Sequence, residues 1–78
     1  MGRRKRLRAV ATFPSTHDAV EAEALCQKSG IAGRLIPTPV AIRATCGLSW
    51  SMDPADRPAF EAQVSGHFAV ESIRELLL

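Results

Sequence analysis

Prolines and glycines divide this chain into short segments, and this punctuation limits the folds that it can adopt. The 78 residues contain five prolines and five glycines, which leave room for one short helix or strand at a time. No apolar run approaches the ~18 residues that a membrane-spanning helix needs. Because 46% of the residues are hydrophobic, the chain can still form a core. One small domain is expected, which excludes a TIM barrel or a two-domain enzyme.

The first half of the chain begins with a strand and a helix. Residues 7–13 form a near-continuous apolar run, which is typical of a central strand buried on both faces. Ser15 is a good N-cap, and it predicts a helix over residues 16–29. Gly30 stands where the residue after a helix adopts a left-handed conformation.

Two strands with an ambiguous connection are expected next. Residues 33–37 read as a short strand, and Pro37 places it at an edge because proline cannot donate to the sheet. Residues 40–45 fit either a strand or a short helical turn. Residues 48–52 alternate apolar side chains with serines, which predicts a half-buried strand.

The last third of the chain predicts a helix and a final strand. A helix is expected over residues 55–65 with Asp56 as its cap, because Pro58 is tolerated only in the first turn. Its apolar face carries Phe60, Val64 and His67. Residues 70–78 permit a strand or a helix. A strand completes an α+β, ferredoxin-like βαββαβ two-layer sandwich with an antiparallel sheet, and this is the predicted fold.

The charge is unevenly distributed along the chain. The net charge is +2, but half of the ten basic residues stand before residue 9, at Arg3, Arg4, Lys5, Arg6 and Arg8. Residues 9–78 carry five basic residues against eight acidic ones, a net charge of −3. We therefore expect a flexible basic arm over residues 1–8 and a single domain over residues 9–78. The apolar stretch after the arm is too short for a signal peptide, which predicts a cytoplasmic protein with reduced cysteines.

Metal and cofactor sites are not indicated by the sequence. The candidate ligands His17, Cys26, Cys46 and His67 match no zinc-binding spacing. The chain also lacks a Gly-x-Ser-x-Gly nucleophile motif and a phosphate-binding loop. We therefore expect no metal and no cofactor.

The two cysteines differ in their sequence surroundings. Cys26 lies in the middle of the first helix, where a small buried side chain is expected. Cys46 lies in the connection before the third strand, on a loop expected to be accessible to partners. Gly47 lets the backbone approach a bound group and aim N–H groups at an anion such as a thiolate or persulfide. Arg43 and Arg34 could favour the thiolate, whereas a helical turn just before Cys46 would disfavour it.

Three polar residues at the start of the first helix form a second candidate site. Ser15, Thr16 and His17 stand where exposed helix N–H groups could bind an anion. His17 could also protonate a leaving thiol. Ordinary capping and solvation explain the same residues without any function.

Short ordered motifs along the chain resemble a known family. They are Phe13–Ala19, Glu23, Gly30–Ile31, Leu35–Pro39, Cys46–Leu48 and Val70–Ile73. Over most of residues 9–76 the chain is similar to a family of small bacterial selenium/sulfur carrier-like domains. This resemblance implies that Cys46 holds sulfur or selenium as a persulfide or selenopersulfide. It also implies two protein partners, a donor such as a cysteine desulfurase and an acceptor enzyme, and a carrier rather than a self-contained enzyme.

Two other classes of function remain open. The chain could be a non-catalytic interaction or ligand-sensing module, and pairing of edge strands could produce a homodimer. An RNA-binding module could use the basic arm to contact phosphates. The absence of tyrosine, the single tryptophan and the acidic body argue against RNA, whose bases stack on exposed aromatic side chains.

Overall fold

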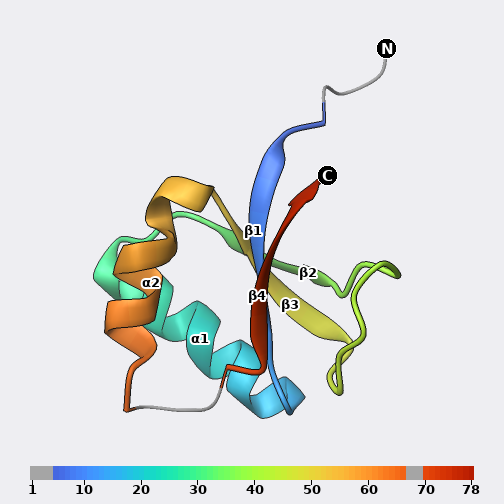
Figure 1. Ribbon diagram of the computed structural model, residues 1–78. Helices are drawn as coiled ribbons and strands as arrows, with labels where there is room; N and C mark the ends of the chain where they lie inside the picture. Colours follow the sequence, from blue (N-terminus) through green and yellow to red (C-terminus); the bar gives the residue numbers. More distant parts are fainter. Residues whose placement is uncertain (1–4, 67–69) are drawn as a thin grey trace.

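Two helices lie on one face of a four-stranded antiparallel sheet (Figure 1). The computed structural model describes residues 5–66 and 70–78. The elements are β1 (Leu7–Thr12), α1 (Thr16–Ser29), β2 (Arg34–Pro37), β3 (Leu48–Met52), the 3-10 turn η1 (Pro54–Asp56), α2 (Arg57–Val64) and β4 (Ser72–Leu77). The predicted α+β class is confirmed, and the ambiguous last segment is a strand.

The strand order is β2-β3-β1-β4, so β1 and β3 are internal and β2 and β4 are the edges. The predicted edge position of β2 is confirmed. Within the described part of the chain, no helix has the length and apolar character needed to cross a membrane.

The central strand β1 is buried on both faces, as its apolar sequence predicts. All four residues from Ala9 to Thr12 are fully buried between β3 and β4. The strand begins at Leu7, where the predicted strand also begins, so Leu7 and Arg8 of the predicted arm belong to the sheet. Just before it, Arg6 and Leu78 exchange two backbone hydrogen bonds, each with an N···O distance of 3.0 Å.

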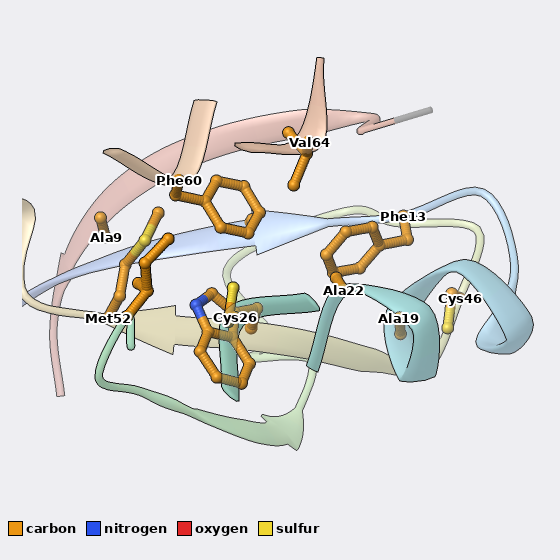
Figure 2. Packing of buried hydrophobic residues seen from close by; sticks show 12 residues of the cluster. Ala9, Phe13, Ala19, Ala22, Cys26, Cys46, Met52, Phe60 and Val64 are labelled. Carbon is orange, nitrogen blue, oxygen red and sulfur yellow. The ribbon is translucent and has the colours of Figure 1, made fainter. Parts of the chain in front are cut away.

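Helix α1 begins and ends at the residues predicted for it. The hydroxyl of Ser15 accepts a hydrogen bond from the amide of Asp18 at 3.2 Å, and Gly30 has the left-handed φ of 76°. The buried face presents Ala19, Ala22 and Cys26 to the sheet. These small side chains let the helix lie close to the strands, where they join the core (Figure 2).

Strand β3 differs from the half-buried strand that its alternation predicts. Its serines, Ser49 and Ser51, are buried like the apolar residues between them. The connection over residues 38–47 projects from the end of β2 away from the helices (Figure 1) and returns to the core at Cys46. The hydroxyl of Ser49 contacts that of Thr38 at 2.7 Å, and Ser51 accepts a hydrogen bond from Arg8 Nε at 3.1 Å. Burial therefore leaves both hydroxyls satisfied.

Gly33 is required by its closeness to the only tryptophan. A Cβ atom at this position would lie 2.6 Å from Cζ2 of Trp50 and 2.6 Å from the carbonyl oxygen of Ser51. The indole of Trp50 is 1% exposed, and its Nε1 has no hydrogen-bond partner among the described residues. A glycine hydrogen is thus the only substituent that lets the chain cross the ring before β2.

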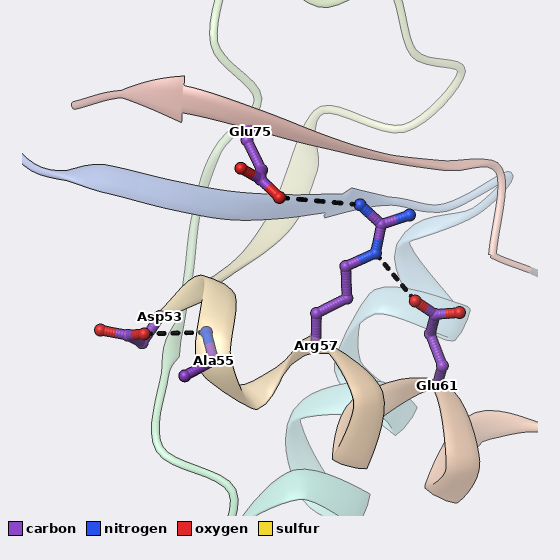
Figure 3. Close-up of polar contacts among 5 residues, drawn as sticks. All are labelled: Asp53, Ala55, Arg57, Glu61 and Glu75. Atoms are coloured by element: carbon purple, nitrogen blue, oxygen red, sulfur yellow. Dashed lines mark hydrogen bonds and ion pairs between the residues drawn. The ribbon is translucent and has the colours of Figure 1, made fainter.

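Helix α2 is shorter than predicted, and Asp56 occupies its predicted N-cap position without a capping side-chain bond. Asp56 makes no capping hydrogen bond, whereas Asp53 accepts one from the amide of Ala55 at 2.9 Å and starts η1 (Figure 3). Pro58 lies in the first turn of α2, where its missing N–H has no cost. His67, predicted on the face of this helix, lies outside the described residues.

Arg57 connects α2 to the sheet. Its Nε donates to Glu61 at 2.8 Å within the helix, and its Nη1 lies 4.0 Å from Glu75 of β4 (Figure 3). The helix layer therefore holds one edge of the sheet by charge as well as by apolar packing.

Candidate functional site

Cys46 lies at the end of the core that is nearest to the start of α1. Its side chain belongs to the same buried cluster as Phe13 and Ala19 (Figure 2). Only 5% of the residue is exposed, whereas the neighbouring Gly47 is exposed. The prediction of an accessible cysteine is therefore wrong for the side chain. The loop reaches the surface at Gly47, but the sulfur of Cys46 is buried.

Two polar groups contact the sulfur of Cys46. The amide of Leu48 donates a hydrogen bond to Sγ at 3.3 Å, and the hydroxyl of Thr16 lies 3.5 Å from Sγ. Thr16 is the first residue of α1, so the sulfur faces the positive end of the helix dipole. The amide of Leu48 can only donate to the sulfur, whereas either atom can be the donor in the contact between Thr16 and Sγ.

Thr38 fixes the backbone on either side of the sulfur. Its hydroxyl donates to the carbonyl oxygen of Cys46 at 3.0 Å, and its amide donates to the carbonyl oxygen of Gly47 at 2.8 Å. Thr38 stands between Pro37 and Pro39, which restrict its backbone. The cysteine is therefore held by a rigid residue from the end of β2.

Glu71 fixes the same loop from the far edge of the sheet. One carboxylate oxygen accepts the amide of Thr45 at 3.1 Å, and the other accepts its hydroxyl at 2.6 Å. These bonds, the hydroxyl first and the amide second, lower the pKa of Glu71. Since Glu71 precedes β4 and Thr38 follows β2, the loop spans the end of the sheet from one edge to the other.

The ambiguous segment before Cys46 forms neither a strand nor a helix. Residues 40–45 contain turns, bends and irregular backbone, and in one turn the amide of Ile42 donates to the carbonyl oxygen of Pro39 at 2.9 Å. The expected negative helix end next to Cys46 is therefore absent from this described segment. The nearest helix end is instead the positive one of α1.

The other predicted site residues lie apart from the sulfur. Ser15 caps α1, and the exposed His17 pairs with a glutamate one turn further along the helix. Arg34 and Arg43 are exposed, and no hydrogen bond or ion pair joins them to Cys46 within the described residues. Gly47 aims no amide at the sulfur, because the donor is the amide of Leu48. The structure thus brings only Thr16 of these residues to the cysteine.

Cys26 has a different environment, as the sequence predicts. It is fully buried among apolar side chains, and this burial raises the pKa of its thiol to about 11. Both cysteines are free, which confirms the prediction of thiols rather than a disulfide. A thiol of this kind is inert at neutral pH.

Three contributors to the site were missed from the sequence. They are Thr38, the amide of Leu48 and Glu71. The Pro-Thr-Pro string at residues 37–39 was a signal for Thr38, because a polar residue held between prolines is fixed in space. The sequence contains no comparable signal for Glu71.

The fold and the site define a small α+β domain in which the sulfur of one buried cysteine contacts an amide and a hydroxyl. The described residues contain no group of three side chains that could hold a metal ion. The chain belongs to the family described as "Putative Se/S carrier protein-like", whose sequence profile matches residues 8–73. No curated protein and no solved structure matches the chain.

Proposed function

We propose that this protein carries sulfur or selenium on Cys46, as a persulfide or selenopersulfide, between a donor and an acceptor protein. The observation that carries the proposal is the placement of Sγ between the amide of Leu48 and the start of α1 at Thr16. Family membership supports the same chemistry. A cysteine desulfurase is the class of donor that supplies sulfur in this form.

The transfer is a thiol–persulfide exchange. The Cys46 thiolate attacks the terminal sulfur of a donor persulfide, so one S–S bond forms and the donor's S–S bond breaks. The electron pair of that bond leaves with the donor thiolate, and Cys46 becomes the persulfide. The acceptor repeats the exchange in the opposite sense and restores the Cys46 thiolate. No external oxidant or reductant is consumed.

Burial of the sulfur suits a carrier that protects its cargo. A sulfur that is 5% exposed is closed off from small thiols that would reduce a persulfide. Transfer then requires the loop over residues 38–47 to move. The bonds from Thr45 to Glu71 are the exposed part of its attachment, so a partner can break them without opening the core.

We also assign the protein to the ferredoxin-like sandwiches and to the cytoplasm. The alternation of strands and helices and the placement of both helices on one face support the fold assignment. Two free thiols support a reducing compartment, where thiols persist.

Intact-mass measurement after incubation with a cysteine desulfurase and cysteine tests the proposal. We expect a gain of about 32 Da, the mass of one sulfur atom, and its removal by dithiothreitol once the chain is unfolded. The gain disappears in Cys46→Ala and persists in Cys26→Ala, which is the matched control because Cys26 is equally buried but lacks polar contacts. Sulfur on Cys26, or no adduct on the native chain, contradicts the proposal.

A further inference from the structure

A basic groove crosses the face of the sheet that the helices leave open. It has a volume of about 990 Å³, and its lining includes Lys5, Arg6, Arg8, Arg34, Ile36 and Pro39. The strand register explains the lining: Ser51 pairs with both Arg34 and Val10, so side chains of Arg34, Ser51 and Val10 share the face opposite the core. Two residues along β1, Arg8 points to the same side and donates to Ser51.

The cations of the groove lack acidic side-chain partners in the described part of the chain. Among the described residues, none of Lys5, Arg6, Arg8 and Arg34 forms an ion pair. The acidic side chains lie elsewhere: most belong to the helix layer, and Glu75 of β4 faces Arg57. The charged side chains that line the groove are therefore all cationic, which attracts an anionic partner and raises its association rate.

The groove is lined by apolar as well as cationic side chains. Ile36 and Pro39 form part of its lining, and Leu78 at its margin is 41% exposed. The volume of the groove is far larger than a single phosphate group requires, which favours an extended ligand. The cationic and apolar lining residues fit a ligand that has both carboxylates and apolar groups.

Single-stranded nucleic acid fits this surface less well than a peptide. Sheet-based nucleic-acid modules stack bases on exposed aromatic side chains. The aromatic residues in the described part, Phe13, Trp50 and Phe60, are all buried in the core on the helix side. The open face therefore offers charge and aliphatic contact but no stacking platform.

We propose that this groove docks an acidic, partly apolar peptide segment of a partner protein. Carboxylates of the segment pair with Arg6, Arg8 and Arg34, and its apolar side chains contact Ile36 and Pro39. This proposal does not depend on the chemistry of Cys46. It makes recognition of the partner a property of the sheet face, separate from the sulfur at the start of α1.

Fluorescence anisotropy with a labelled peptide of Glu-Glu-Leu repeats tests the groove. We expect binding that weakens as salt is added, because screening reduces the attraction between exposed charges. Arg34→Glu and Arg6→Glu each lower the affinity about tenfold, since a reversed charge replaces an attraction with a repulsion. Lys28→Glu is the matched control, because it makes the same charge change on α1, and it leaves the affinity within about twofold. Cys46→Ala binds like the native chain.

Three results would overturn the proposal. The first is no saturable binding of the peptide, and the second is equal weakening by Lys28→Glu and Arg34→Glu. The third is tighter binding of an oligouridine than of the peptide, with loss of that binding in Arg34→Glu, which would make the groove a nucleic-acid site. A peptide of Gln-Gln-Leu repeats should not bind, and thermal melts of each variant establish that the fold is kept.

Discussion

At the scale of single residues, the two cysteines show how environment separates equal side chains. Both are buried, but Cys26 has apolar neighbours that raise the pKa of its thiol to about 11. Cys46 has an amide and a hydroxyl at its sulfur. Reactivity toward an alkylating reagent at neutral pH should therefore be confined to Cys46.

Removing the hydroxyl at Thr16 should slow the chemistry of Cys46. Thr16→Val keeps the shape of the side chain but loses the contact at 3.5 Å from Sγ. A hydrogen bond contributes about 0.5–1.5 kcal/mol net, so we expect alkylation of Cys46 to fall about twofold to tenfold at fixed pH. Stopped-flow measurement with a maleimide reports the rate. Thr16→Ser restores the hydroxyl and should recover most of it; equal rates in the two variants would show that the contact is unimportant.

A methyl group at Gly33 should destabilise the fold. It would meet the Trp50 ring and the carbonyl of Ser51 at 2.6 Å, a distance that forces the backbone or the ring to shift. Gly33→Ala is expected to lower the free energy of unfolding by about 1–3 kcal/mol, as overpacking does in other cores. Urea denaturation measures this loss. Gly47→Ala is the control, because no atom lies within 4 Å of its added Cβ, and it should change stability by less than about 0.5 kcal/mol.

Features that depend on neighbouring residues in the chain were predictable, whereas contacts between distant residues were not. Ser15 and Gly30 were predicted because a cap depends only on its neighbours in the chain. The contact between Thr16 and Cys46 joins residues 30 positions apart, which depends on how α1 crosses the sheet. Both residues were predicted as site residues, but nothing in the sequence indicated that they contact each other.

At the scale of elements, the connection from Thr38 to Gly47 is the part of the chain that controls the sulfur. It has no regular secondary structure and is attached at Thr38 and through Thr45 to Glu71. The strands and helices around it were predictable from apolar periodicity and from proline and glycine positions. The path of this connection was not predictable. Its hydrogen bonds reach Ser49 of β3 and Glu71 just before β4, which are distant from each other in the sequence.

Protonation of Glu71 should release the loop. The folded-state pKa of Glu71 is lowered, so the stabilisation by Thr45 is present above the ordinary pKa and is lost as pH falls through the lowered value. The amide shift of Thr45 in NMR spectra should therefore titrate with a midpoint below about 4.3, the usual value for glutamate. A midpoint at or above that value would contradict the stabilisation of the loop by the hydrogen bonds between Thr45 and Glu71.

Loss of the Glu71 carboxylate at neutral pH should expose Cys46. Glu71→Gln removes the charge and one acceptor from Thr45, so we expect faster alkylation of Cys46 than in the native chain, by about twofold to fivefold. Glu61→Gln changes a carboxylate on α2 whose side-chain partner among residues 5–66 and 70–78 is Arg57, and it serves as the control. Equal rates in both variants would locate the barrier to access elsewhere.

At the scale of the whole molecule, charge is sorted between two faces. The open face of the sheet is cationic, and the helix layer carries most of the carboxylates. The sequence showed the imbalance between residues 1–8 and the remainder. It did not show that Arg8 and Arg34 meet on one face, because that depends on the register of β1 and β2 against β3.

Removing one unpaired cation should stabilise the fold, whereas removing a paired one should not. Arg34→Gln relieves repulsion among the groove cations and is expected to raise the free energy of unfolding by about 0.5 kcal/mol, less in high salt. Arg57→Gln loses its contacts with Glu61 and Glu75 and is expected to lower it by a similar amount. Thermal melts at two salt concentrations measure both. Changes of the same sign and size in the stability of the two variants would contradict the separation of charge between the two faces.

The burial of Trp50 gives the molecule a single built-in optical probe. The chain has one tryptophan and no tyrosine, so its ultraviolet emission comes almost entirely from one indole. That indole lies in β3, two residues after the amide that contacts the sulfur of Cys46. Opening of the loop or unfolding of the sheet will therefore change the emission wavelength or intensity of an unlabelled sample, and both events can be timed without attaching a dye.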